Sequence, residues 1–195
     1  MNFDQWRHYG RGLVLEFFKR PEQALEAYRA ALRHNPDFIQ AARCLGYLHA
    51  QRREYQDAED YYLVVLRTQT QDADTWFNLG YLRDQAGRHA QAVEAFQEAV
   101  KHHPKHDRAW YGLGHAHAAL GQHEKAAEAL QHAAELQPMN GHAWYALGMA
   151  YHHNHQPEKV QEVAHYLSRF DPALTRRLVQ ESERADLSHL IHDLR

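Results

Sequence analysis

The pentapeptide WFNLG at residues 76–80 returns as WYGLG at residues 110–114 and as WYALG at residues 144–148. The spacing is 34 residues each time, and the pair Leu45-Gly46 stands one further period toward the N-terminus. A repeat of fixed length between about 20 and 50 residues decides the architecture of a chain before any local motif does. The sequence therefore predicts an array of similar structural units.

The second half of each unit repeats with the same period. A small residue recurs at Ala24, Ala58, Ala92 and Ala126. A large residue follows four positions later, at Tyr28, Tyr62, Phe96 and Leu130. Prolines mark the ends of four units, at Pro36, Pro104, Pro138 and Pro172. Because apolar places are three and four residues apart, each half of a unit is predicted to be an amphipathic helix.

The turn residues agree with a pair of helices in each unit. Gly87 and Gly121 fall where the first helix must end and the chain reverse. Pro21 and Pro157 lie in the equivalent stretch and suit the first turn of a second helix. A single helical hairpin cannot bury both of its sides, so neighbouring hairpins are expected to stack into a solenoid.

This pattern resembles the W-x2-L-G…A-x3-F-x2-A…P pattern of the tetratricopeptide repeat family. The resemblance implies an all-α fold, a right-handed superhelical solenoid of about five helix-turn-helix units in a single domain, 1–195. The units are expected at residues 5–38, 39–72, 73–106, 107–140 and 141–174. A C-terminal capping helix is expected over residues 175–195, with a break near Asp186.

Two units depart from the pattern. In the first unit, His8 and Arg11 take the Trp and Leu places, although Gly12 keeps its phase. In the last unit, Val160 and Leu167 replace small residues and Ala164 replaces the large aromatic one. This exchange of volumes leaves the total packing roughly conserved, which indicates a retuned fifth repeat.

The composition limits the classes of partner and the compartment that we expect for this chain. The chain has 22 Lys and Arg against 25 Asp and Glu, with a formal net charge of −3, so a nucleic-acid partner is disfavoured. Cys44 is the only cysteine, which excludes an internal disulfide and fits a reducing compartment. Neither a signal peptide nor an apolar run long enough to span a membrane is present in the sequence. We expect no membrane insertion and a cytoplasmic location.

The resemblance also implies a place for partners. In this family the first helix of each pair lines a concave groove that binds a protein or peptide. By phase, this groove contains Tyr9, Arg43, Tyr47, Phe77, Asn78, Tyr81, Arg108, Tyr111, His115 and Tyr145, with His142, Met149 and His152 in the last unit. Rows of exposed aromatic residues are typical of peptide grooves. The alternative is that aromatic residues at these places only support neighbouring helices.

Three of these residues suggest a sharper hypothesis. Arg43, Asn78 and Arg108 resemble three of the five polar places with which some members of this family grip a terminal carboxylate. Tyr47 and Gly112 stand where such a clamp would have a second Asn and a second basic residue. The alternative is that both arginines are simply solvated.

The first helix carries an apolar stripe at helical spacing. Trp6, Tyr9, Leu13 and Phe17 form this stripe, and exposing it to water costs about 25 cal/mol per Å². One hypothesis is that Trp6, Leu13 and Phe17 dock on a partner or on a second copy of the chain, which would make a homo-oligomer. The alternative is that the helix is rotated from the family register and only caps the solenoid.

The chain has 18 histidines, with clusters at residues 102–106 and 152–155. Imidazoles bind metals and titrate near neutrality, so a metal site or pH-dependent binding are alternatives, but no zinc signature accompanies them. No H-E-x-x-H, Walker-type loop or G-x-S-x-G occurs. The sequence favours a non-catalytic protein-interaction scaffold without a cofactor, and a histidine-rich ligand or metal sensor and a self-assembling scaffold remain as alternatives.

Overall fold

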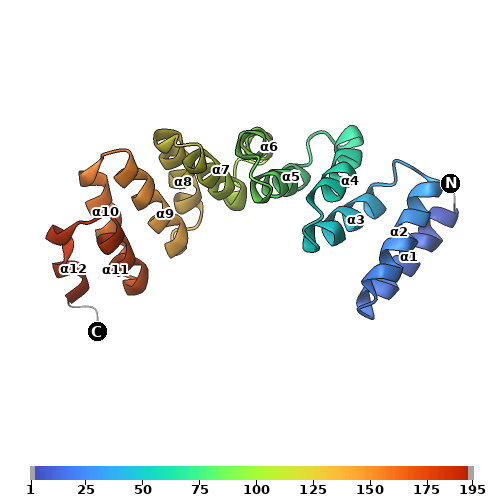
Figure 1. Cartoon of the computed structure of the whole chain (residues 1–195), viewed down its shortest axis with the longest axis horizontal. Helices are drawn as coiled ribbons and strands as arrows, with labels where there is room; N and C mark the ends of the chain where they lie inside the picture. Colours follow the sequence, from blue (N-terminus) through green and yellow to red (C-terminus); the bar gives the residue numbers. More distant parts are fainter. Residues whose placement is uncertain (1–2, 193–195) are drawn as a thin grey trace. The chain divides into compact units, whose positions relative to one another are not determined.

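The computed structural model of the chain describes residues 3–192, with the side chain of His192 left aside, and throughout this range it consists of helices joined by short turns (Figure 1). No strand occurs in this range. The chain divides into two compact units, Met1–Gly87 and Arg88–Arg195, and each unit has its own core. None of the described helices is both long and apolar enough to cross a membrane. The all-α fold predicted from the sequence is confirmed.

Unit 1 consists of two helical hairpins and the first helix of a third one. Its helices are α1 (Phe3–Phe17), α2 (Pro21–His34), α3 (Ile39–Gln51), α4 (Tyr55–Thr68) and α5 (Ala73–Gln85). Each helix contacts the next along the chain, both within a hairpin and from one hairpin to the next. Tyr28 of α2 is fully buried in the core of this unit, which also contains the buried Leu45 of α3.

Unit 2 contains the remaining helices. They are α6 (His89–His102), α7 (Asp107–Ala119), α8 (His123–Leu136), α9 (Gly141–His153), α10 (Pro157–Leu167), α11 (Pro172–Glu181), the 3₁₀ helix η1 (Ala185–Leu187) and α12 (His189–His192). The helices α7 and α8 form one hairpin and α9 and α10 form the next, while α11 contacts both helices of the last hairpin. One continuous core runs from α8 to η1.

The helices begin at the period of the sequence. First helices start at Ile39, Ala73, Asp107 and Gly141, and second helices start at Pro21, Tyr55, His89, His123 and Pro157. Each set advances by 34 residues. Pro21 and Pro157 are the first residues of α2 and α10, where a missing N–H costs nothing because no intrahelical acceptor faces it. The placement predicted for both prolines is therefore confirmed.

One left-handed residue ends the first helix of every hairpin. Positive φ angles between 54° and 74° recur every 34 residues, at Lys19, Arg53, Gly87, Gly121 and His155. After Lys19, Arg53, Gly121 and His155, the next residue donates its N–H to a carbonyl five positions back, as in the 2.9 Å bond from Gln122 to His117. Glycine adopts this conformation freely, whereas the other three residues adopt it at a steric cost.

Close approach of the two helices in a hairpin explains the repeated glycine. A Cβ placed on Gly46 would lie 2.7 Å from the Tyr62 ring, and one on Gly12 would lie 2.3 Å from the Tyr28 ring. Gly12 of α1 therefore lies against Tyr28 in the same way as Gly46 of α3 lies against Tyr62. The helix α1 therefore keeps the common register, and the alternative that it is rotated is wrong.

In the last hairpin, a side chain of the capping helix fills the space that the large residue of the second helix fills in the other hairpins. Ala164 stands at the place of the large residue, and a Cβ on Gly148 would meet Leu178 of α11 at 2.7 Å and Val163 at 3.2 Å. Leu178 is fully buried. The exchange between Val160, Leu167 and Ala164 is therefore completed by the capping helix.

The capping segment is interrupted as predicted. The helix α11 ends at Glu181, Glu183 has a φ of 55°, and η1 follows around Asp186. The helix begins at Pro172, three residues earlier than expected. The predicted cap also includes residues 193–195, which lie outside the described range.

Candidate functional site

A cavity of about 430 Å³ lies in unit 2, lined by residues of α7, α8, α9 and α11. We call it the histidine cavity. Its lining consists of Tyr111, His115, Ala118, His123, Leu130, His142, Tyr145, Ala146, Met149, Ala150, His153 and Arg177. Four imidazoles and one guanidinium occur in this lining, and no carboxylate does. The volume is that of a small-ligand site or of a few side chains of a peptide.

Two tyrosines give the cavity apolar surface with polar tips. Tyr111 and Tyr145 occupy equivalent places on α7 and α9, one period apart. Burial raises the pKa of Tyr111. Burial, together with a hydrogen bond to Glu181, raises the pKa of Tyr145 to about 12. Both hydroxyl groups are therefore protonated at neutral pH, and each can donate a hydrogen bond.

A carboxylate from the capping helix already occupies the polar edge of the cavity. Arg177 donates from Nε to Oε1 of Glu181 at 2.7 Å, and the Tyr145 hydroxyl donates to Oε2 of the same residue. The Arg177 guanidinium also lies over the Tyr145 ring, 4.7 Å from its centre. These donors lower the pKa of Glu181, with Arg177 as the larger cause. The edge of the cavity is thus built to hold a carboxylate group.

The imidazoles are arranged around the rest of the cavity. The His115 ring centre lies 4.4 Å from that of Tyr111, and the His123 ring centre lies 5.0 Å from that of His153. Nδ1 of His123 is buried and makes no hydrogen bond to any part of the chain that the structure describes. A buried polar atom without a partner is costly, so a ligand or water that bonds to it would be favoured.

The structure brings together five of the residues predicted for the groove. Tyr111, His115 and Tyr145 line the histidine cavity, as do His142 and Met149. Arg108 is exposed on α7 and is not among the lining residues. The groove predicted from the sequence did not include His123, which lies on the second helix α8, or His153, which lies off the groove phase of α9. It also did not include Arg177, because the capping helix has no repeat phase.

In unit 1 the predicted groove residues have different surroundings. Tyr47 and Tyr81 are exposed on α3 and α5, one period apart, whereas Phe77 and Asn78 are half-buried. Tyr9 packs inward, with its ring centre 5.8 Å from that of Tyr28 and 5.5 Å from that of Phe38. Tyr9 therefore contributes to the core of unit 1 in addition to any role at the surface.

Arg43 of the predicted clamp is already engaged in an ion pair. One of its terminal nitrogens, Nη2, donates to Asp72 Oδ2 at 2.5 Å and to Gln69 Oε1 at 2.6 Å. A ligand carboxylate would have to compete with Asp72 for this guanidinium. Asn78 lies in the same unit and Arg108 in the other unit, so the clamp remains a prediction for the set of three.

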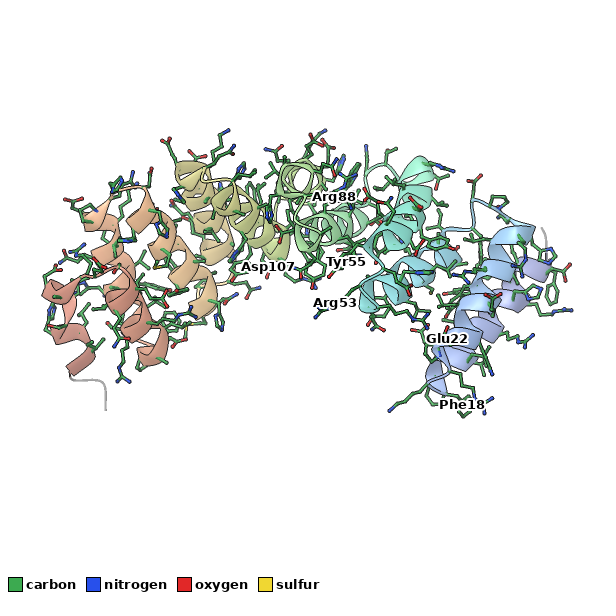
Figure 2. The ribbon with its side chains drawn as sticks, in the orientation of Figure 1. Phe18, Glu22, Arg53, Tyr55, Arg88 and Asp107 are labelled. Carbon is green, nitrogen blue, oxygen red and sulfur yellow. The ribbon has the colours of Figure 1, made fainter. Side chains whose placement is uncertain are left out.

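One side of α1 is apolar and exposed. Trp6 and Leu13 are each 44% exposed and Phe17 is 81% exposed, and the neighbouring Phe3 and Val14 are exposed as well. We call these five residues the α1 apolar face. Phe18 extends the apolar surface at the turn between α1 and α2 (Figure 2).

Gly10 lies in the middle of the α1 apolar face. A Cβ at this position would meet no atom within 4 Å. Glycine inside a helix costs about 0.5–1 kcal/mol relative to alanine. The packing of unit 1 therefore gives no reason for glycine at this position.

Among the described residues, one group of three side chains brings possible metal ligands within 4.8 Å of one another, and it consists of His49, Glu54 and Asp57. His49 is buried, and its Nδ1 lies 2.6 Å from Glu54 Oε2. The same contact recurs two periods later between His117 Nδ1 and Gln122 Oε1 at 2.7 Å. Because a neutral amide serves equally well there, both contacts are explained as hydrogen bonds that join a first helix to the following turn.

Comparison with known proteins identifies the repeat. The family model described as tetratricopeptide repeat matches residues 9–73, 77–138 and 114–159. No curated protein matches the chain. Among solved structures, the MamA protein aligns with a TM-score of 0.80 at 20% identity, covering 96% of this chain and 98% of the other.

Two further solved structures show the same fold. YrrB, named as a tetratricopeptide protein with an unusual peptide-binding site, has a TM-score of 0.78 at 21% identity, over 91% of this chain and 90% of the other. The PilF protein of Pseudomonas aeruginosa has a TM-score of 0.72 at 17% identity, over 96% and 88%. At these identities the likeness concerns the fold alone.

Proposed function

Because this chain belongs to the tetratricopeptide repeat family, we propose that it is a non-catalytic interaction scaffold that binds a segment of a partner protein in the histidine cavity. One observation carries the proposal: Tyr111 and Tyr145 come from successive repeats and line the same cavity with His115. Aromatic anchors in a partly enclosed site are typical of the residues that dominate binding energy. The peptide-binding site named for YrrB belongs to that protein, and it is consistent with this use of the fold.

The chemistry of the lining favours a peptide over a rigid small molecule. Ala118, Ala146 and Ala150 leave room beside the tyrosines and Met149, and methionine adapts its shape to different partners. The polar atoms lie on several helices rather than around one point. Such an arrangement suits an apolar side chain held in the cavity and a peptide that extends along the helices.

A capture experiment tests this proposal. The full chain and its Tyr111→Ala, Tyr145→Ala double variant would be used to capture partners from the native host. We expect the double variant to lose its specific partner, since each truncation removes a contact worth about 1–3 kcal/mol. A matched control is Tyr47→Ala with Tyr81→Ala, which removes two exposed tyrosines of unit 1.

The two variants have distinct outcomes. Loss of the partner only in the Tyr111, Tyr145 variant supports the histidine cavity as the binding site. Unchanged capture by that variant would contradict it. Capture that depends on Tyr47 and Tyr81 instead would move the binding site to the exposed tyrosines of α3 and α5.

A second candidate function, self-association through the α1 apolar face, is favoured by Gly10. Two copies of α1 that cross at Gly10 could bring their backbones close together, because no Cβ intervenes. Burial of Phe3, Trp6 and Phe17 in both copies would remove exposed aromatic surface from water. This arrangement would give glycine a role that the packing within unit 1 does not provide.

Light scattering over a range of protein concentrations tests self-association. We expect a mass that rises with concentration, and a monomer at all concentrations for Leu13→Ser with Phe17→Ser. Met139→Ser is a suitable control, because Met139 is an exposed apolar residue in the turn between α8 and α9. A concentration-independent monomer in the unchanged chain would contradict this second candidate.

A further inference from the structure

We propose that the histidine cavity selects acidic peptides, that a ligand carboxylate replaces Glu181 on Arg177 and Tyr145, and that binding tightens as the pH falls through the range in which imidazoles gain a proton. This inference rests on the proposed function, since it names the ligand class of the same cavity. It does not depend on the clamp predicted at Arg43, Asn78 and Arg108.

The sign of the charge in the cavity supports an anionic ligand. The lining contains His115, His123, His142, His153 and Arg177 and no carboxylate. The chain as a whole has more Asp and Glu than Lys and Arg, so this segregation is local. The hollow between residues of α1 and α2 differs, because Glu22 and Glu26 line it together with Arg11 and Arg33. The histidine cavity thus combines apolar surface with donors of one charge sign.

Glu181 shows which groups would hold the ligand carboxylate. Its two oxygens accept from the Arg177 Nε and from the Tyr145 hydroxyl, so the two donors are already spaced for one carboxylate. The side chains of Arg177 and Glu181 are 56% and 42% exposed, and they form a pair four residues apart on one helix. Exposed pairs of this kind contribute little, because water screens them. A ligand that also fills the apolar part of the cavity can therefore displace Glu181.

The pH dependence follows from the groups that face the cavity. They are His115 and Tyr111 on α7, His123 on α8, His142, His153 and Tyr145 on α9, and Arg177 on α11, while Glu181 of α11 contacts Arg177 and Tyr145 from outside the lining. The tyrosines stay neutral and Arg177 stays charged near neutrality. The carboxylates of Glu181 and of the ligand remain ionised down to about pH 5. Histidine is the side-chain type whose charge ordinarily changes near neutral pH, and positive charge in the cavity favours an anionic ligand.

Two matched peptide pools test the inference. The peptides are about ten residues long, carry a rhodamine label, and place Leu, Phe and Tyr between Glu residues in one pool and between Gln residues in the other. Fluorescence polarisation with the full chain at about pH 6 and about pH 8 gives the affinity of each pool. We expect the Glu pool to bind about tenfold more tightly than the Gln pool at the lower pH. We expect this preference to fall by about threefold to tenfold at the higher pH.

Variants assign the effect to residues. Arg177→Gln is expected to weaken only the Glu pool, whereas Glu181→Gln is expected to strengthen it by removing the internal competitor. His115→Gln with His142→Gln is expected to reduce the pH dependence. His165→Gln is the matched control, since His165 is exposed on α10 and bonds to the carbonyl of Gln161. Circular dichroism checks that each variant keeps its helices.

The outcomes separate this inference from the proposed function. Equal affinity for both pools, or a preference that does not change with pH, would overturn the inference and leave partner binding in the cavity intact. Binding of neither pool would also overturn it, and the capture experiment with Tyr111→Ala and Tyr145→Ala would then decide the proposed function alone. A stronger preference in Glu181→Gln and a lost preference in Arg177→Gln would support the inference.

Discussion

The first and last hairpins of the chain use the same repeat but end differently. At the C-terminal end, α11 and η1 cover the last hairpin and bury Leu178 and Leu187. At the N-terminal end, the α1 apolar face leaves Phe3 and Phe17 exposed within the described residues. Terminal repeats normally need a polar outer face or a cap, because each repeat buries its apolar sides only against neighbours. The exposed α1 apolar face is the surface that the proposed self-association would bury.

The largest effect is expected where the cap enters the last hairpin. Leu178→Ala removes a fully buried side chain that fills the space beside Gly148, so it should lower the free energy of unfolding by about 3–5 kcal/mol. Urea unfolding followed by circular dichroism measures this loss. The control is Leu13→Ala on the α1 apolar face, which should change stability by less than about 0.5 kcal/mol in the monomer. A loss below about 1 kcal/mol for Leu178→Ala would mean that the cap does not complete the last core.

Two glycines of α1 sharpen the comparison at the N-terminal end. Gly12→Ala should destabilise the chain by about 1–3 kcal/mol, because its Cβ would lie 2.3 Å from the buried Tyr28 ring. Gly10→Ala should stabilise the monomer by about 0.5–1 kcal/mol, because its Cβ meets nothing and alanine favours the helix. Thermal unfolding of both variants at low protein concentration tests the pair. Equal effects would show that α1 is rotated from the position seen here.

The sequence predicted the fold well where the period was strict. The 34-residue spacing predicts where the repeated helices begin and where the turn residues lie, because turn chemistry and helix packing recur in every unit. The turn residues are Gly87, Gly121, Pro21 and Pro157. The early start of α11 was not predicted, since no repeat precedent sets the phase of a cap. Tertiary packing of Leu178 against Gly148 fixes that helix instead.

The candidate site was predicted only in part. Tyr111, His115 and Tyr145 were found because groove positions recur on first helices. Arg177 and Glu181 were missed, since their meeting with Tyr145 depends on how α11 packs on α9. Trp6, Leu13 and Phe17 of the α1 apolar face were named from their helical spacing. The open space at Gly10 could not be read from that spacing, because only the structure shows which glycine has space around it.

The turns inside the first and last hairpins should respond alike to substitution, although the two ends of the chain are covered differently. Lys19 ends α1 and His155 ends α9 with φ angles of 54° and 55°, whereas Gly87 and Gly121 occupy the equivalent places elsewhere. A side chain in this region costs about 1–2 kcal/mol of strain, which replacement by glycine relieves. The replacement also loses about 0.4–1 kcal/mol of stability, because glycine gives the unfolded chain more conformational freedom. Lys19→Gly and His155→Gly should therefore each stabilise by about 0.5–1 kcal/mol in urea unfolding. A loss of stability in either variant would show that its side chain makes a compensating contact.

The smallest effect concerns the carboxylate at the edge of the C-terminal cap. The pKa of Glu181 is lowered first by Arg177 and then by Tyr145, so its folded-state pKa lies below that of the unfolded chain, which is about 4.3. The contribution of this contact to stability is therefore complete above that pH and is lost as the pH falls through the folded-state pKa. A carbon-detected NMR titration should place the midpoint of Glu181 below the ordinary value for glutamate.

The same titration ranks the two donors. Arg177→Gln should move the midpoint of Glu181 back toward its ordinary value by more than Tyr145→Phe does, because Arg177 is the larger cause of the shift. If Tyr145→Phe had the larger effect, the hydroxyl rather than the guanidinium would be the main holder of the carboxylate. The bond from α9 to the cap, rather than the ion pair within α11, would then set the titration of Glu181, and salt would change the midpoint less than it would for a shift caused by an ion pair.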